Sequence, residues 1–501
     1  MNHALILPVL LPMFVGSVLL FAPRLSLTLQ RSLGLLSTLL VLLIGTYLLG
    51  LADQGALHSY AVGNWQAPFG IVLLLDRLSA LLLVVTAVLA LFALIYAVRG
   101  DDARGKNFHS LFQFQLMGIN GAFLTGDLFN LFVFFEILLI ASYALLLHGG
   151  GAERVRAGIH YVVLNLLGSS LFLLAVGVMY GITGTLNMAD MAVKVAAASA
   201  DDAALLGAAG LLLLVVFGLK AAFVPLYFWL PRAYASASAP VAALFAIMTK
   251  VGLYSIMRVY ILIYGEQASS IANLAADWLW PLALLTILCG VVGALAAASI
   301  QGLLAYLVVA SVGSLLAGVA LGTQQALSAA LFYLIHSTWV AGAMFLVADL
   351  ISRQRGDKAG NLVQGPMLLQ PLLLSALFFI GAIALAGLPP FSGFFGKLLL
   401  LRAAAPGIEA LLLWPVLLLG GLLTLVALSR AGSTLLWRTG RDVLGRAERD
   451  DGRTLAAVGL LSSAVLLVLF AAPVLAYVQA TAAQLLDLAP YMQLVPAGER
   501  P

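Results

Sequence analysis

The sequence predicts an all-α, polytopic membrane protein. Of its 501 residues, 63% are hydrophobic and only 9% are charged, whereas soluble domains carry about 25% charged residues. Apolar runs recur along the whole chain, and many reach the roughly 20 residues that a helix needs to span the hydrocarbon core. Glu136, Lys220, Lys250 and Lys397 lie inside such runs. A charge at that depth is costly and persists where it is paired, hydrated or functional.

About fourteen transmembrane helices are expected from the apolar runs. Their approximate spans are 3–22, 33–51, 72–97, 109–126, 129–148, 158–180, 204–229, 240–263, 278–298, 301–321, 326–351, 369–401, 408–430 and 454–478. The first run lacks a basic start and an A-x-A cleavage site, so we interpret it as a retained membrane helix rather than a signal peptide. The narrowest division is the GDLFN stretch around Asp127, between the fourth and fifth spans.

Basic residues are distributed unevenly between the connections that join these spans. The odd-numbered connections carry 17 of them: Arg24, Arg31, Arg99, Arg104, Lys106, Arg154, Arg156, Arg232, Arg353, Arg355, Lys358, Arg430, Arg438, Arg441, Arg446, Arg449 and Arg453. The even-numbered connections and the termini carry three, namely Lys194, Arg402 and Arg500. Because cytoplasmic loops are enriched in Lys and Arg, this asymmetry predicts an even number of spans and places both termini outside the cytoplasm.

The C-terminal part contains two less regular stretches. Residues 430–453 form the most polar connection, which we interpret as a solvated loop that fixes topology. A short surface helix and a docking surface for partner subunits are the alternatives. Residues 479–501 alternate apolar and small residues, a pattern compatible with an interfacial helix.

Two of the expected spans contain helix breakers. They are Pro225 and Pro231 at the seventh span, and Gly387, Pro389 and Pro390 in the twelfth. Proline removes a backbone donor and clashes with the preceding turn, so such breaks survive in membranes where protein or water satisfies the freed groups. Each broken span also carries a lysine, Lys220 or Lys397, which favours an ion site over a simple kink.

The two broken spans lie five helices apart, which predicts an internal repeat. A five-helix unit duplicated in tandem inserts in the opposite orientation because five is odd. We therefore expect two inverted repeats, formed by helices 4–8 and 9–13. The expected organisation is helices 1–3 over 1–108, the first repeat over 109–263, the second over 264–430, and a cytoplasmic connection, helix 14 and the tail over 431–501.

Glu136 and Lys220 are the first candidate pair. Each charge would be expensive alone in the membrane, and opposite charges within reach stabilise one another. A static ion pair would only lock two helices together. In the functional alternative the pair is switchable, and the lysine releases a proton when the pair loosens.

Three further titratable groups extend this candidate site. Lys250 has no acidic neighbour along its own helix, and desolvation would let it lose and regain a proton near neutral pH. His336 lies on an apolar helix, where it would complete a relay between the lysines of helices 8 and 12. Lys397 would exchange protons with one surface. The supporting polar residues are Thr249, Tyr333, Ser337 and Thr338.

Other charged residues near these spans receive structural interpretations. Asp76 and Arg77, at the start of the third span, are expected to form an interfacial ion pair. Arg258 lies two turns after Lys250 and is expected to extend its head group to the membrane interface.

Several function classes find no support in the sequence. There is no P-loop, no nucleophile motif such as G-x-S-x-G, and no histidine pair that suggests haem or a metal. The single cysteine, Cys289, rules out a disulfide within the chain and is expected to be a small buried hydrophobe. No cofactor or metal, and no nucleic-acid partner, is expected.

The motifs around the buried charges resemble a known family. They are FEILLIASYALL at Glu136, FGLKAAFVPLYFWLPRAY at Lys220, TKVGLYSIMR at Lys250 and GLPPFSGFFGK at Lys397. The chain is similar to the antiporter-like subunits shared by respiratory complex I, membrane-bound hydrogenases and Mrp cation/proton antiporters. The resemblance is greatest to the D-type subunits of Mrp antiporters. The features that favour these subunits are the stretch GNWQAPFGIVLLLDRLSALLL, Tyr227 and Tyr234, Lys397 and the chain length.

The resemblance implies a role for each candidate residue. It makes Glu136 and Lys220 the coupling pair of helices 5 and 7, Lys250 the central proton carrier, His336 the link on helix 11 and Lys397 the terminal group. The chain departs from some relatives at Gln301, where they are basic. It also departs at Ala341, where they have a lysine, so the relay would depend more on His336 and bound water.

The resemblance also implies partners and a location. It predicts a secondary-transporter subunit of a hetero-oligomeric complex in the bacterial inner membrane, moving protons against Na⁺ or K⁺. Two alternatives remain. One is a proton-pumping subunit of a redox complex driven by quinone or hydrogenase chemistry, and the other is a membrane scaffold with degenerate charges.

Overall fold

The computed structural model describes residues 3–22, 24–65, 70–440 and 450–494. Among them, 11 helical segments are long and apolar enough to cross a membrane, and α1 (Leu7–Phe21), α15 (Pro371–Ala386) and α20 (Ala471–Leu486) are shorter apolar helices. The prediction of a helical polytopic membrane protein is confirmed. The count of fourteen stays a prediction, because α4 (Phe108–Leu124) falls in neither group.

The N-terminal part is a helical pair, a β-hairpin and a third helix. It comprises α1, α2 (Leu27–Ala52), β1 (His58–Ala61), β2 (Val72–Leu75) and α3 (Arg77–Ala97). The two strands are antiparallel, with His58 opposite Leu75. Ser26 accepts a hydrogen bond from the backbone N–H of Leu29 and so caps α2, which explains why this helix begins six residues before the expected span at 33.

The middle part begins with α4 and covers the residues in which both repeats are expected. Its first half is α4, α5 (Leu128–Leu147), α6 (Ala152–Thr183), α7 (Met188–Ala196), α8 (Ala200–Ala221), α9 (Trp229–Ser236), α10 (Ala239–Phe245) and α11 (Met248–Leu262). Its second half is α12 (Ala276–Ala296), α13 (Ile300–Ala320), α14 (Gln324–Arg353), α15, α16 (Ser392–Ala403) and α17 (Ile408–Gly432). Both predicted breaks are present, between α8 and α9 and between α15 and α16.

The structure contains a third helix interruption that the sequence did not predict. The expected span 240–263 is divided at Ala246 and Ile247, which separate α10 from α11 just before Lys250. The segment is rich in Ala and contains no internal proline or glycine before Lys250, so its pattern carries no breaker signal. The interruption lies where the segment is fully buried by neighbouring helices.

The last helices also differ from the expected span 454–478. They are α18 (Asp451–Leu461), α19 (Ser463–Leu469), α20 and α21 (Ala489–Met492). Tyr491 is buried against the bundle, so the end of the described tail packs on protein rather than lying free at an interface. In the polar stretch 430–453, α17 continues to Gly432 and a π-helical turn follows over Ser433–Trp437. Residues 441–449 and 495–501 of these stretches lie outside the described residues.

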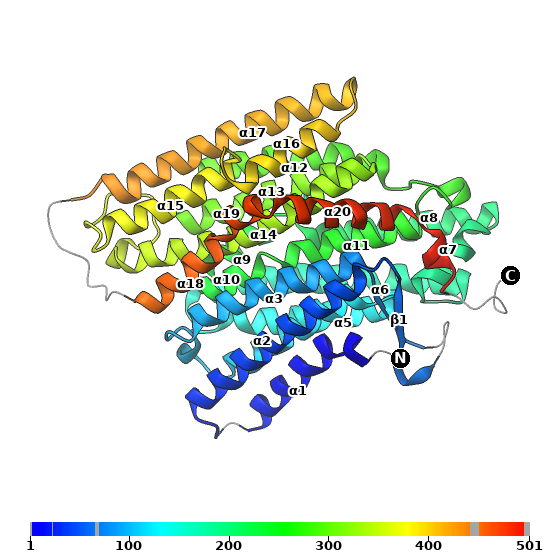
Figure 1. The fold of residues 1–501 in the computed structure, drawn as a ribbon, viewed down its shortest axis with the longest axis horizontal. Helices are drawn as coiled ribbons and strands as arrows, with labels where there is room; N and C mark the ends of the chain where they lie inside the picture. The colour runs from blue at the N-terminus through cyan, green and yellow to red at the C-terminus, as the bar shows by residue number, and fades with distance from the viewer. Residues whose placement is uncertain (1–2, 23, 66–69, 441–449, 495–501) are drawn as a thin grey trace.

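The helices lie side by side along the long axis of the molecule, with α1 at one edge and α17 at the other (Figure 1). The centre is formed by α10–α11, α13 and α14. The most apolar stretch of Ala239–Leu262 is completely buried, whereas only 33% of the most apolar stretch of Ile408–Trp437 is buried. Apolar side chains exposed on outer helices, such as Ile159 and Leu166 of α6, fit contact with lipid or with other subunits.

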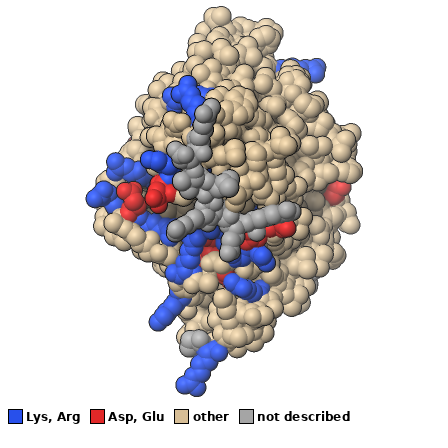
Figure 2. Space-filling view, turned by 90° about the vertical axis from the view of Figure 1, so that its left-hand side faces the viewer, with Lys and Arg blue, Asp and Glu red and all other residues tan. Residues whose placement is uncertain are grey.

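Charged side chains gather at one end of the bundle. Both termini lie at one end (Figure 1), and Figure 2 shows Lys and Arg gathered on the opposite end. There, ion pairs join connections that are far apart in sequence. Asp101 binds Arg353 at 2.8 Å and Arg453 at 3.1 Å, and Asp102 binds Arg31 at 2.6 Å. The odd-numbered connections that these residues represent therefore share one face.

Candidate functional site

Glu136 and Lys220 are brought together through a serine. Ser169 of α6 donates a hydrogen bond to Oε1 of Glu136 on α5. Its hydroxyl oxygen accepts one from Nζ of Lys220 on α8, at 3.4 Å. Among the described ion pairs, no direct Glu136–Lys220 contact occurs within 4.0 Å. Because a hydroxyl both donates and accepts, Ser169 connects the two opposite charges without letting them neutralise one another directly.

The surroundings of Lys220 favour its ammonium group in a buried position. Its Nζ lies 3.5 Å from the backbone oxygen of Asn165 and 5.6 Å from the centre of the Phe135 ring, over its face. Both contacts attract a cation. Asn165 and Ser169 are four residues apart and thus lie on one face of α6. Both of these α6 contacts of Lys220 therefore come from one face of the helix.

The first helix break positions Lys220. α8 ends at Ala221, and Ala222 follows in the left-handed region with φ of 60°. The freed groups find side-chain partners: the indole Nε1 of Trp229 donates to Leu219 O at 3.0 Å, and Thr286 Oγ1 accepts from the N–H of Val224 at 3.0 Å. Pro225 lies in the gap and Pro231 in the first turn of α9. Lys220 thus sits in the last helical turn, where a cation is favoured.

Lys250 is isolated at the centre of the bundle. Its side chain is fully buried, and its Nζ has no hydrogen-bond partner among the described residues. The adjacent Thr249 Oγ1 is also buried and unpaired there. A buried ammonium without a partner is costly. Within the described part of the chain, no hydrogen bond joins Lys250 to Lys220 or His336, so the predicted chain of groups is not continuous through side-chain contacts.

The second helix break brings His336 and Lys397 to one place. Nδ1 of His336 on α14 lies 2.8 Å from the hydroxyl of Ser392, the first residue of α16. Nζ of Lys397 donates to the backbone oxygens of Ala386 at 2.8 Å and Leu385 at 3.4 Å. These are carbonyls of the last turn of α15, which the break leaves without helical partners.

Residues predicted as breakers form the backbone of this second gap. Gly387 ends α15 with φ of 81°, a conformation that favours glycine. A Cβ at this position would also lie 2.6 Å from Cδ of Lys397. Pro389 and Pro390 follow in the gap before α16. The break therefore both frees the carbonyls that bind Lys397 and makes room for its side chain.

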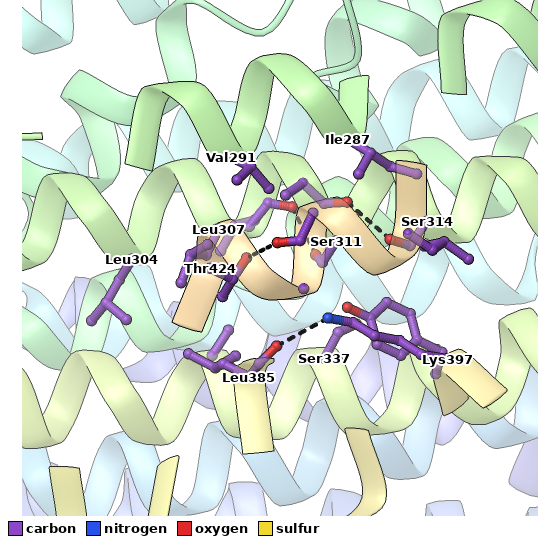
Figure 3. A pocket seen from close by; sticks show the side chains of 17 residues that line it. Ile287, Val291, Leu304, Leu307, Ser311, Ser314, Ser337, Leu385, Lys397 and Thr424 are labelled. Atoms are coloured by element: carbon purple, nitrogen blue, oxygen red, sulfur yellow. Dashed lines mark hydrogen bonds between the residues drawn. The ribbon is translucent and has the colours of Figure 1, made fainter. Parts of the chain in front are cut away.

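Lys397 faces a small cavity of about 30 Å³ that several hydroxyl groups line, large enough for a water molecule. The hydroxyl groups that line it come from three helices: Ser311 and Ser314 of α13, Tyr333 and Ser337 of α14, and Thr424 of α17 (Figure 3). The serine and threonine hydroxyls donate to carbonyls of their own helices, so their oxygens remain free to accept hydrogen bonds from water or ammonium.

Of the polar residues predicted to support His336, the structure places two at this cavity. Tyr333 and Ser337 line it, and the Tyr333 ring centre lies 5.6 Å from that of His336. Thr338 instead donates to Leu334 O of its own helix at 2.8 Å and is absent from the lining. Ser392 and the α13 serines were missed, because sequence alone does not reveal which hydroxyls face the break.

Two structural predictions are wrong. Asp76 is fully buried and binds Arg258 at 2.7 Å instead of pairing with Arg77 at the interface. Arg77 pairs with Asp53 at 2.5 Å. Arg258 is only 2% exposed and does not extend to the surface. Neutralisation by Asp76 offsets the cost of burying the arginine, and 182 residues separate the partners in sequence, so spacing carries no signal for this pair.

The described residues contain no cluster of three or more His, Cys, Asp or Glu side chains that could hold a metal ion. The candidate site consists of lysines, a histidine, a carboxylate and hydroxyl groups, all of which can bind or pass protons.

Comparison with known proteins identifies the family. A family model described as "NADH:quinone oxidoreductase/Mrp antiporter, TM" matches residues 125–424, more than half of the chain. The chain belongs to this family. The matched residues of the NADH:quinone oxidoreductase/Mrp antiporter family include every residue of the candidate site, from Glu136 to Lys397, and the resemblance deduced from the motifs is confirmed.

Individual relatives cover nearly the whole chain. A Rhizobium meliloti protein, named as a probable D-type subunit of a K⁺/H⁺ antiporter, is 42% identical over 97% of this chain and 96% of its own length. A protein of Alkalihalophilus pseudofirmus, named as the D-type subunit of a Na⁺/H⁺ antiporter, is 38% identical over 99% of both chains.

Solved structures of the family share the fold. A chain of the Mrp complex from Dietzia sp. has a TM-score of 0.86 at 28% identity, covering 99% of both chains. A chain of an archaeal respiratory membrane complex, the membrane-bound sulfane sulfur reductase, has a TM-score of 0.89 at 26% identity, covering 99% of this chain and 100% of that chain.

Proposed function

We propose that this chain is the proton-translocating subunit of a multisubunit Na⁺/H⁺ or K⁺/H⁺ antiporter. The observation that carries the proposal is the placement of buried titratable side chains beside two helix breaks. At the first, Ser169 connects Glu136 with Lys220. At the second, His336 and Lys397 bind groups of the broken segment. The names of the most similar relatives supply the ion class.

The first group, formed by Glu136, Ser169 and Lys220, would act as a switch. With the Ser169 hydroxyl between them, Glu136 and Lys220 can strengthen or weaken their interaction through a rotation of one small side chain. When the Ser169 hydroxyl turns away, the Lys220 ammonium loses its connection to the Glu136 carboxylate and its proton becomes easier to release. When the hydroxyl returns, the amine takes up a proton again.

Lys250 would be the central carrier, and the second group the terminal one. Since Lys250 is buried without a partner among the described residues, either of its protonation states depends on water or on movement of a neighbour. His336 would pass a proton toward Lys397, which borders both the 30 Å³ cavity and a cavity of about 310 Å³ lined by α15–α17. The 30 Å³ cavity would hold water against Lys397, Tyr333 and Ser337.

The proposal includes an assembly and an orientation. The chain would work with other subunits of a hetero-oligomeric antiporter in the bacterial inner membrane, with both termini outside the cytoplasm. The gathering of Lys and Arg at the end opposite the termini (Figure 2) supports this orientation, because cytoplasmic faces are rich in basic residues.

The inverted repeats belong to the same proposal. Each half would contain one broken helix with a lysine at the break, Lys220 in residues 109–263 and Lys397 in residues 264–430, flanked by residues 1–108 and 431–501. The similar use of a lysine at both breaks supports this division.

The decisive experiment measures proton flux in everted membrane vesicles that contain the whole complex. Pulses of NaCl and KCl are compared with a redox substrate, for the wild type and for Glu136→Gln, with assembly checked on native gels. Cation-driven flux in the wild type that is lost in the assembled variant supports the proposal. Flux driven only by the redox substrate would overturn it in favour of a redox-driven pump.

A further inference from the structure

A second polar feature lies at the end of the bundle that holds both termini. It is a cavity of about 250 Å³ between the β-hairpin, α7, α11 and the C-terminal segment. Ser59 and Asn64 are exposed at its edge, whereas Arg258 lines it and is 2% exposed. The volume is sufficient for several water molecules. The cavity therefore leads from the surface to a buried charge.

Arg258 is held rigidly and still has one free donor group. Its Nη1 lies 2.7 Å from Oδ2 of Asp76, and its Nε donates to the hydroxyl of Tyr254 at 3.2 Å. Tyr491 donates to the same Asp76 oxygen at 2.6 Å, and the N–H of Ser79 donates to the other at 2.8 Å. Nη2 of Arg258 is buried and has no partner among the described residues, so one donor group of the buried guanidinium is unused.

The same face of α11 leads from this cavity to the central lysine. Lys250, Tyr254 and Arg258 are spaced by four residues, which places them on one side of the helix at intervals of about 6 Å. The Tyr254 hydroxyl accepts from Arg258 and donates to Phe123 O at 2.8 Å. Lys250 Nζ, one turn further, is unpaired among the described residues. The three side chains form a polar stripe within a buried helix.

We propose that this cavity is the aqueous mouth through which Lys250 exchanges protons with the membrane face that bears both termini. Tyr254 is the hydroxyl that connects the lysine to the mouth. A proton that leaves the Lys250 ammonium passes to water. When the Tyr254 hydroxyl turns from Phe123 O, it accepts that proton and donates its own to water of the cavity. Arg258 stays protonated throughout, so with Asp76 it holds Tyr254 and the mouth in place rather than carrying the proton. The inference rests on the proposed function, since it assigns a route to that transport.

The first test removes the connecting hydroxyl. Tyr254→Phe is compared with Tyr260→Phe, which changes a second buried tyrosine of α11 that also donates to a backbone oxygen, that of Gly210. Loss of a hydrogen bond to a charged group predicts cation-driven proton flux about tenfold or more lower in Tyr254→Phe, with Tyr260→Phe near wild type. Equal flux in the two assembled variants would overturn the role of Tyr254.

The second test obstructs the mouth. In a Cys289→Ala background, Ser59→Cys is treated with a bulky, membrane-impermeant thiol reagent on intact cells, before everted vesicles are prepared, because this face lies outside the cytoplasm in the proposed orientation. Ala200→Cys, exposed at the start of α8, is the labelled control. We expect modification to stop the flux of Ser59→Cys and to leave that of Ala200→Cys unchanged. Full modification of Ser59→Cys without any loss of flux would show that protons do not use this cavity.

Lys250→Ala separates this inference from the proposed function. If Lys250→Ala complexes exchange cations for protons normally, the proposed function itself fails. If Lys250→Ala abolishes exchange whereas Tyr254→Phe and modified Ser59→Cys transport like wild type, only the mouth is overturned. Loss of flux in all three, with both controls active, supports the route from Lys250 along α11 to the cavity.

Discussion

At the scale of single residues, a serine hydroxyl separates the two opposite charges of the first group. The sequence predicted Glu136 and Lys220 as a pair because each is costly alone in an apolar run. It could not predict Ser169 between them, because a serine is compatible with any face of a membrane helix. The same applies to Ser392 beside His336. Charged residues can be recognised in such an apolar sequence, whereas the hydroxyl groups that connect them cannot.

Replacing the bridging serine should weaken the switch. We expect Ser169→Ala to lower cation-driven proton flux about tenfold, since it removes hydrogen bonds to two charged groups. Ser170→Ala is a matched control, because Ser170 is exposed and donates to Leu166 O of its own helix. Flux in vesicles, normalised to assembled complex, measures the difference. Identical flux in the two variants would remove Ser169 from the account.

Asp127, in the connection between α4 and α5, allows a test by pH. Burial raises the pKa of its carboxyl from 3.8 to about 6, although the N–H groups of Asn130 and Phe129 favour the charged form. Because the folded pKa lies above the unfolded one, the folded state binds the proton more tightly. The stability that this proton contributes is complete below about pH 4 and is lost as the pH rises through about 6.

Asp127→Asn should therefore reduce the loss of thermal stability between about pH 4 and about pH 6 and raise stability above that range. An asparagine can still accept the N–H of Asn130 that caps α5. Asp127→Ala is the comparison, and loss of the cap should cost about 0.5–2 kcal/mol at every pH. Melting temperatures of the purified complex across this range provide the measurement. If the difference in melting temperature between the wild type and Asp127→Asn does not change with pH, Asp127 does not have the raised pKa.

At the scale of helices, the breaks and one close contact determine where the lysines lie. Prolines and Gly387 made the α8–α9 and α15–α16 breaks predictable. The α10–α11 interruption beside Lys250 has no such signal, and only packing in the centre of the bundle explains it. Gly252 lets α11 approach α8 closely, because a Cβ there would lie 2.4 Å from the backbone nitrogen of Ala221 and 2.8 Å from the carbonyl carbon of Lys220.

Gly252→Ala should force these two helices apart. Overpacking of this kind costs about 1–3 kcal/mol, and we expect a lower melting temperature together with reduced proton flux. Gly177→Ala on α6 is the control, since nothing lies within 4 Å of a Cβ at that position; it should be neutral or stabilise by up to about 1 kcal/mol. Equal melting temperatures for the two variants would show that the α8–α11 contact tolerates a side chain.

At the scale of the whole molecule, composition and charge distribution predicted most of the architecture. Low charge and long apolar runs predicted the helical membrane fold, and the uneven distribution of Lys and Arg anticipated a bundle with one basic end. Long-range pairs escaped prediction. Asp76, the N-cap of α3, and Arg258 of α11 meet only in the folded chain. Local spacing instead suggested Arg77 as the partner of Asp76 and the membrane interface for Arg258. Buried titratable side chains lie beside both helix breaks, and Lys250 lies between these breaks in the sequence. The central claim that follows is that protons pass through this chain.

That claim is tested most directly by cation-driven proton flux in everted vesicles containing the assembled complex, with Lys250→Ala measured beside Lys106→Ala. Lys106 is an exposed lysine in a loop, so both variants lose one lysine but only one loses the buried carrier. The account predicts that Lys250→Ala abolishes the flux while assembly on native gels is unchanged and Lys106→Ala transports like the wild type. Normal flux through assembled Lys250→Ala complexes would contradict it.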